Sequence, residues 1–182
     1  DQVTLTLKDL MAYTQIGKST AMDAVIPLAE MVAREQARAF AIKEDACLII
    51  GDGTSTYGGM QGIVTLLETA AYAGGRFVAP ANTDVFSEVT ASDTAGVIGK
   101  LPVYARTGAR WLCSGVFEAS VFGRLKLSAG GNTNPVMREG IVESDYAGFP
   151  VSLAHNMPSD PTADLTNKIM CVLGNFQLGV AF

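Results

Sequence analysis

The stretch from residue 22 to residue 63 constrains this chain more than any other. Apolar residues recur there at intervals of three and four, the period of one face of an α-helix, and include Val25, Ile26, Ala29, Val32, Ala33, Ala37, Phe40 and Ala41. Asp23 suits the N-cap, and Pro27 falls in the first turn, where the missing N–H of proline costs least. We therefore expect one long helix from about residue 24 to about residue 50.

The polar face of this expected helix carries both signs of charge. Glu30 and Arg34 are four residues apart, and Glu35 and Arg38 are three apart, so each pair can meet on the helix surface. Two ion pairs on a solvated face are the simplest interpretation.

A glycine-rich loop follows the helix. Gly51 can take the left-handed conformation that ends a helix, and Asp52-Gly53 suits a tight turn. No lysine follows the glycines, as a phosphate-binding loop requires. Tyr57 replaces the second glycine of a nucleophile elbow, and Ile63 stands where a calcium loop needs a bidentate carboxylate. We therefore expect this loop to turn the chain and not to bind a ligand.

The rest of the chain predicts a mixed α+β fold without repeats. We expect strands over 1–7, 111–114, 148–154, 169–174 and 176–182, because these runs are apolar or alternate between apolar and polar residues. Helical segments are expected from a cap at Ser92 or Asp93 to Lys100, briefly up to Gly108, and over 116–127. Residues 61–71 suit a strand or a short helix, and residues 130–135 form a turn. Trp111 is expected to anchor the core.

Composition excludes several classes of function. The 13 Lys and Arg residues are scattered and the net charge is −5, so we expect no sequence-specific binding of nucleic acid. No apolar run reaches the roughly 20 residues of a membrane span. Cys47, Cys113 and Cys171 are far apart in sequence and sit in apolar runs, which indicates reduced, buried thiols without the spacing of a metal site.

Candidates for catalysis are few. His155 is the only histidine and follows an expected strand, where a solvated loop residue is a simpler interpretation than a general base. Ser55 lies in the glycine-rich loop without a recognisable activating partner. We assign no catalytic, cofactor-binding or metal-binding residue, and we expect a protein that is not an enzyme.

Four motifs in order resemble the major capsid proteins of tailed bacteriophages, which share the HK-ninety-seven-type fold. The first runs from Ile42-Lys43-Glu44-Asp45 through Gly51-Asp52-Gly53-Thr54 to Gly62-Ile63. The others are Ala109 to Ser114, Gly148-Phe149-Pro150-Val151 with His155-Asn156-Met157-Pro158, and Gly174-Asn175-Phe176, in which Asn175 replaces the common Asp.

The resemblance implies a structural subunit of an icosahedral viral shell. It implies that residues 1–63 are part of a P-domain with a long spine helix, and that residues 64–182 are mainly part of an A-domain. Both ends of the chain then look truncated, and the family's crosslinking residues would lie outside it. No cofactor is implied.

The partners and location follow from the same resemblance. It implies self-assembly of the full-length protein into hexamers and pentamers, without a membrane, in the cytoplasm of a bacterial host and then in the virion of a phage or prophage. We expect this segment alone to be monomeric or a small oligomer. Two alternatives remain: an encapsulin-type bacterial compartment shell, and an unrelated α+β hydrolase using Ser55 or His155.

Overall fold

The computed structural model describes residues 9–17, 28–69, 74–81, 83–128, 137–138, 141–142 and 144–179. The chain divides into two compact units, Asp1–Thr65 and Leu66–Phe182, and each is described by itself. The expected strand over 1–7, the start of the long helix with Asp23 and Pro27, and the turn over 130–135 lie outside the described residues.

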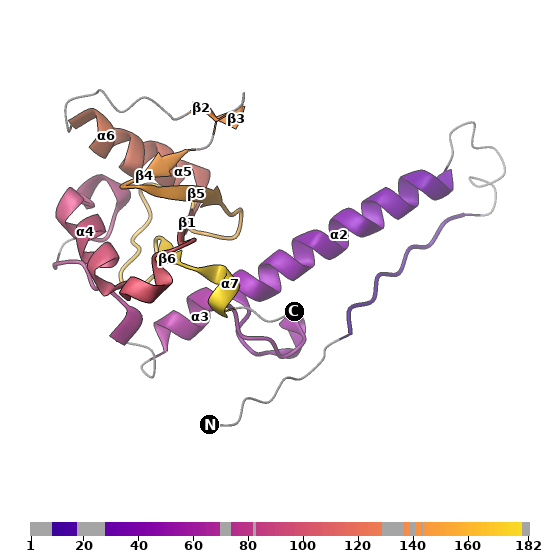
Figure 1. Cartoon of the computed structure of the whole chain (residues 1–182). Coiled ribbons are helices and arrows are strands. Elements are labelled where there is room, and N and C mark those ends of the chain that lie inside the picture. The colour runs from indigo at the N-terminus through magenta and orange to yellow at the C-terminus, as the bar shows by residue number, and fades with distance from the viewer. Residues whose placement is uncertain are drawn as a thin grey trace. The chain divides into compact units, whose positions relative to one another are not determined.

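The first unit is built on one long helix, α2 (Leu28–Ile50). It ends at Ile50, directly before Gly51, as the sequence predicts. The expected left-handed conformation of Gly51 was wrong, because this glycine instead allows a close approach of backbone atoms. Residues 9–17 run alongside it without secondary structure, and Figure 1 shows them in indigo beside the helix. The Gln36 side-chain amide donates a hydrogen bond of 3.1 Å to the Thr14 hydroxyl, so the two segments are directly linked.

One of the two expected ion pairs on α2 forms. Arg34 Nη2 lies 2.6 Å from Glu30 Oε1, and this is the only ion pair among the described residues. The expected pairing of Glu35 with Arg38 does not form, and Glu35 lines a groove between α2 and residues 9–17. Glu30, Arg34, Glu35 and Arg38 are all exposed, so the expectation of a solvated face is confirmed.

The loop after α2 is closed by backbone hydrogen bonds. Asp52 pairs with Gln61 as an isolated antiparallel bridge, and a short 3-10 helix, η1 (Ser55–Tyr57), forms the tip. The helix α3 (Ile63–Glu68) follows, so the expected strand or short helix over 61–71 is a helix.

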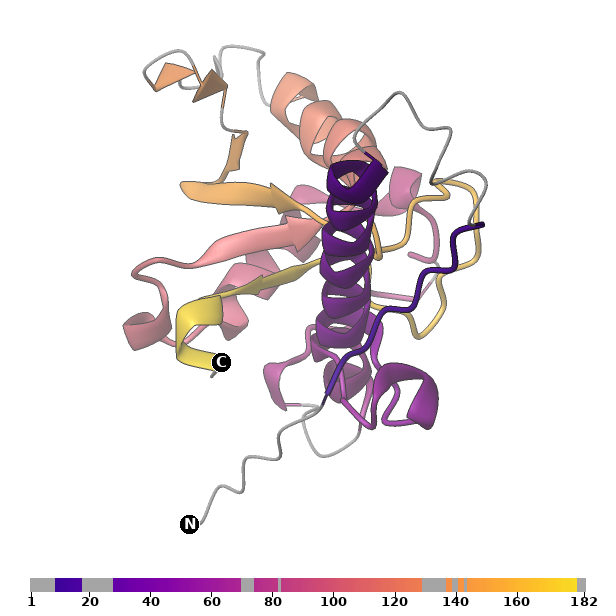
Figure 2. The ribbon, with the colours of Figure 1, turned by 90° about the vertical axis from the view of Figure 1, so that its right-hand side faces the viewer.

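A four-stranded sheet in the order β4-β5-β1-β6 organises the second unit (Figure 2). Its strands are β1 (Arg110–Cys113), β4 (Asp145–Tyr146), β5 (Phe149–Leu153) and β6 (Val172–Gly174). The central strand β1 is parallel to β5 and antiparallel to β6. A separate hairpin pairs β2 (Met137–Arg138) with β3 (Ile141–Val142).

Short helices accompany this sheet. They are η3 (Phe86–Glu88), α4 (Ala91–Lys100), η4 (Val103–Ala105) and the continuous run α5 (Gly115–Phe117), η5 (Glu118–Gly123, a π-helical turn) and α6 (Arg124–Ser128). The last helix is α7 (Phe176–Gly179).

Three local expectations were wrong, each for a capping reason. The cap of α4 is Thr90, not Ser92 or Asp93, and Asp93 reaches back to the Thr90 backbone N–H at 2.8 Å as the other half of a capping box. Ser114 is not a strand residue but the cap of α5. Residues 176–179 are helical, because the Asn175 side chain accepts the Gln177 N–H at 3.0 Å and starts a turn.

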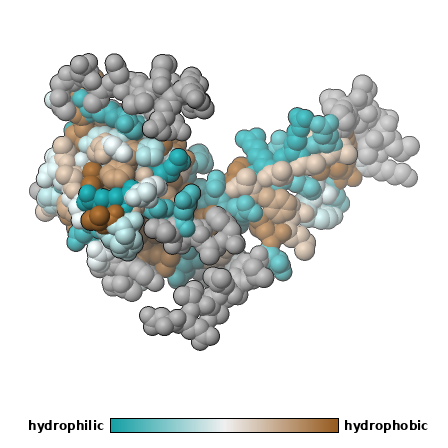
Figure 3. Space-filling model, viewed as in Figure 1, coloured by the Kyte–Doolittle hydropathy of each residue, from teal (hydrophilic) through white to brown (hydrophobic). Residues whose placement is uncertain are grey.

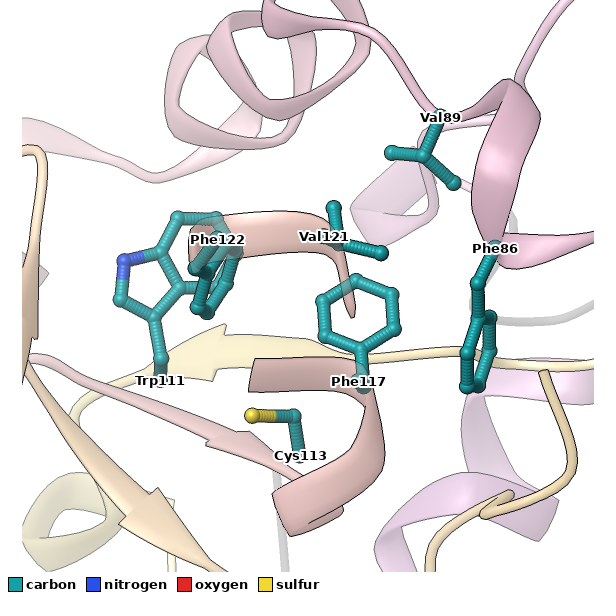
Figure 4. Close-up of a cluster of buried hydrophobic side chains, with 7 residues drawn as sticks. All are labelled: Phe86, Val89, Trp111, Cys113, Phe117, Val121 and Phe122. Atoms are coloured by element: carbon teal, nitrogen blue, oxygen red, sulfur yellow. The ribbon is translucent and has the colours of Figure 1, made fainter. Parts of the chain in front are cut away.

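The core of the second unit is aromatic (Figure 4). Trp111 is fully buried, as expected, and packs edge-on against Phe122 with ring centroids 5.2 Å apart. Phe117 makes the same kind of contact with both Phe86 and Phe122. Edge-to-face packing is a favoured aromatic geometry, so these rings fix the helices against the sheet.

Candidate assembly surface

The most exposed apolar surface of the first unit lies along α2. A groove of about 470 Å³ runs between the helix and residues 9–17. Its lining consists of Leu10, Met11, Ala12, Tyr13, Thr14, Met31, Val32, Glu35, Gln36, Ala39, Phe40 and Lys43. Most of these side chains are apolar. Glu35 carries a negative charge and Lys43 a positive charge, so the charges of the lining balance. The groove therefore suits an apolar occupant without a strong charge.

The apolar side chains at this groove are open to solvent. Met11 is 91% exposed, Tyr13 85% and Met31 55%. Figure 3 shows hydrophobic residues along one side of the helix and hydrophilic residues along another. A helix gains most of its stability by packing its apolar face, and exposed apolar patches commonly mark protein contacts. We therefore treat this groove as the candidate site.

The buried residues in the described part of helix α2 lie near its C-terminal end. Among the described residues of the helix, Cys47 and Ile49 are the buried ones, whereas every residue from Leu28 to Ala46 is exposed or half-buried. Lys43 also lies over the Tyr57 ring, 4.9 Å from its centroid, and so ties the helix to the loop tip. The loop thus holds one end of a helix whose apolar groove is left open by the described residues of this unit.

The loop at residues 51–62 owes its shape to its glycines and to Asp52. The Asp52 carboxylate accepts hydrogen bonds from the Thr54 N–H at 2.9 Å and the Thr54 hydroxyl at 2.6 Å. These bonds lower the pKa of Asp52 below its usual value. Gly53 has a φ of 81°, which favours glycine. The side chain of Asp52 is thus used within the turn, in keeping with a structural role for the loop.

Two sequence motifs meet in the second unit. One is the segment Ala109 to Ser114, which contains β1, and the other is the segment His155 to Pro158. The Ser114 hydroxyl donates to the Pro158 carbonyl and accepts the Phe117 N–H at 3.2 Å. Ser114 therefore joins the start of α5 to the Met157-Pro158 turn. Met157 is buried beside it. These residues, singled out by sequence, are brought together for packing.

The candidate catalytic residues are both exposed. Ser55 is exposed in the first unit, and His155 is exposed on a turn of the second unit. Within the described ranges, no three His, Cys, Asp or Glu residues are grouped as metal ligands. In the same part of the chain, no helix is long and apolar enough to cross a membrane.

Only some of the residues that line the groove were predictable from the sequence. The helical period identified Val32 and Phe40 as apolar-face residues, and both line the groove. It did not identify Met31 or the segment Leu10 to Tyr13. The run Leu10-Met11-Ala12-Tyr13 was the available signal, because four successive apolar residues outside a sheet or helix are unusual on a surface.

Comparison with known proteins identifies a family for the chain. The model of the phage capsid family matches residues 1–181. No curated protein and no solved structure matches the chain. The match covers nearly the whole chain, so this protein belongs to the phage capsid family. It is a structural subunit of a capsid, and its place is in the virion.

Proposed function

We propose that the chain is part of an HK-ninety-seven-type major capsid subunit of an icosahedral phage or prophage head. In this proposal residues 1–63 form part of the P-domain with α2 as the spine helix, and residues 64–182 form mainly part of the A-domain. The order of long helix, Gly-Asp-Gly turn and mixed sheet supports it, together with membership of the phage capsid family.

The groove along α2 is, in this proposal, a contact between subunits. A capsid is built from many copies of one subunit, so we expect a second copy of the chain to occupy the groove. The exposed side chains of Met11, Tyr13 and Met31 supply the apolar area that a stable contact buries. Repeated contacts of this kind would join subunits into hexamers and pentamers in the host cytoplasm, before the virion is released.

The observation that carries the proposal is an apolar groove that the described residues leave open, in a member of a shell-forming family. Nothing among the described residues or in the family match favours an encapsulin-type compartment or a hydrolase that uses Ser55 or His155.

The experiment compares Met31→Glu with Ala41→Glu. Both positions are exposed on α2, but only Met31 lines the groove. The protein that carries this sequence is expressed in bacteria, and its assembled fraction is measured by sedimentation velocity. We expect Met31→Glu to reduce the assembled fraction by at least tenfold and Ala41→Glu to leave it within twofold, because only the first buries a charge at the contact. Equal assembly of the two variants would contradict the proposal.

A further inference from the structure

Two of the three cysteines lie at one end of the β1–β6 pairing in the second unit. In the antiparallel ladder of β1 and β6, Arg110 pairs with Gly174 and Leu112 pairs with Val172. Cys113 is the last residue of β1 and Cys171 directly precedes β6, so extending this register by one step brings Cys171 opposite Cys113. Both thiols are free.

The register puts this pair within the geometric range of a disulfide. Directly opposed residues of an antiparallel pair have Cα atoms roughly 4.5 or 5.5 Å apart, and their side chains point to the same face. Disulfides span Cα separations of about 4.4–6.8 Å. Cys171 packs against the core cluster that contains Cys113, which is drawn in Figure 4. Alongside burial, the Cys113 thiol contributes to the raised pKa of Cys171, so the two side chains are neighbours.

We propose that Cys113 and Cys171 are an intrasubunit disulfide site that closes when the protein meets a small-molecule disulfide under oxidising conditions. This inference goes beyond the proposed function and does not depend on it. Its setting is the virion, because a capsid leaves the reducing cytoplasm and then persists in oxidising surroundings. The bond would tie the edge strand β6 to the central strand β1.

The reaction is a pair of thiol–disulfide exchanges. Cys171 loses a proton, and its thiolate attacks one sulfur of the small disulfide, which releases one small thiolate and leaves a mixed disulfide on Cys171. Cys113 then loses its proton and attacks the Cys171 sulfur, which releases the second small thiolate. The protein loses two protons and two electrons, and the small disulfide is reduced to two thiols.

Access favours attack by Cys171 first. Cys113 is fully buried, whereas Cys171 is half-buried and lines a cavity of about 490 Å³. Burial raises the pKa of both thiols to about 12, so few thiolates form at neutral pH. The site therefore stays reduced in the cytoplasm and closes slowly elsewhere, at a rate that rises with pH.

The test treats the purified chain with oxidised glutathione at several alkaline pH values. Digestion without reductant followed by mass spectrometry should find the peptide of Cys113 linked to the peptide of Cys171. Titration of the denatured product should then find one free thiol where the reduced chain has three. Because the bond closes over residues 114–170, we expect the melting temperature to rise by on the order of 10 °C.

Two variants distinguish a specific Cys113–Cys171 disulfide from non-specific oxidation of the thiols. Cys47→Ala should keep the cross-link, because Cys47 lies in α2 of the other unit. Cys113→Ala should instead retain glutathione on Cys171, since no second thiol can displace it. A Cys113–Cys47 or Cys171–Cys47 link in its place, three free thiols after complete treatment, or a lower melting temperature of the linked chain would overturn the proposal. Met31→Glu should leave the cross-link unchanged, so failure of groove-mediated assembly and failure of this site give different results.

Discussion

Gly51 and Gly62 pack backbone against backbone at the end of α2. The Gly62 N–H donates a hydrogen bond of 2.8 Å to the Gly51 carbonyl. A Cβ on Gly62 would lie 2.5 Å from the Ile49 carbonyl oxygen, and one on Gly51 would lie 2.5 Å from the Cys47 carbonyl oxygen. Neither position has room for a side chain. The two glycines therefore close the loop onto the last turn of the helix.

Substitution at this contact should destabilise the first unit. Replacing Gly62 with Ala forces rigid backbone apart, so we expect the free energy of unfolding to fall by about 2 kcal/mol or more. Urea denaturation measures the change. Gly74→Ala is the control, because a Cβ there meets nothing within 4 Å. Equal stabilities of the two variants would show that the close approach does not matter.

A second pair of glycines tests the packing of residues 76–81 on α4. A Cβ on Gly96 would overlap the Phe77 ring, whereas one on Gly99 meets nothing within 4 Å. We expect Gly96→Ala to destabilise the chain by about 1 kcal/mol and to speed hydrogen exchange over 76–81, since the ring must move. Gly99→Ala should stabilise it by about 0.5–1 kcal/mol, because Ala is the better helix former. Protection over 76–81 that is equal in both variants would contradict this packing.

We predict that Asn175 stabilises the fold more than the aspartate that is common at this position of the motif. Its Nδ2 donates a hydrogen bond of 2.6 Å to the Thr107 carbonyl, while its Oδ1 accepts the Gln177 N–H. An ionised carboxylate can only accept, so Asn175→Asp should cost about 1–2 kcal/mol at neutral pH. The cost should shrink in acid, where a protonated carboxyl can donate. Thermal unfolding at pH 7 and pH 4 measures both values, and a cost that is independent of pH would contradict the assignment.

The buried thiols should weaken the fold at alkaline pH. Burial raises the pKa of Cys113 and Cys171 from about 9 to about 12. Between these values the unfolded chain loses the protons that the folded chain keeps, so the free energy of unfolding falls as pH rises above about 9. The double variant Cys113→Ala, Cys171→Ala lacks both thiols, so its free energy of unfolding should fall less steeply as pH rises. Identical slopes in urea denaturation from pH 8 to 11 would contradict the burial of the two thiols.

The sequence predicted those parts of the fold that depend on local chemistry. The end of α2 before Gly51 was predictable because glycine and Asp52 leave few alternatives there. The strands of Trp111 and Phe149 were predictable because their residues are strongly apolar. The cap of α4 and the helix that begins at Phe176 were predicted wrongly, and they show the limit of prediction from local sequence. Capping depends on which side chain reaches which N–H, and several neighbours had suitable chemistry.

The candidate surface was only partly predictable, for a physical reason. Periodicity shows that Val32 and Phe40 share a helix face, but it cannot show what covers that face. Residues 9–17 meet α2 through a contact between Thr14 and Gln36, which are far apart in sequence. A groove made by two separated segments has no signature in either segment alone.

Electron microscopy of the protein that carries this sequence, purified from expressing bacteria, tests the central claim most directly. A subunit that assembles through α2 should form closed particles of uniform diameter, and Met31→Glu should abolish them while Ala41→Glu retains them. Monomers alone, across a wide range of salt and protein concentration, would contradict the account.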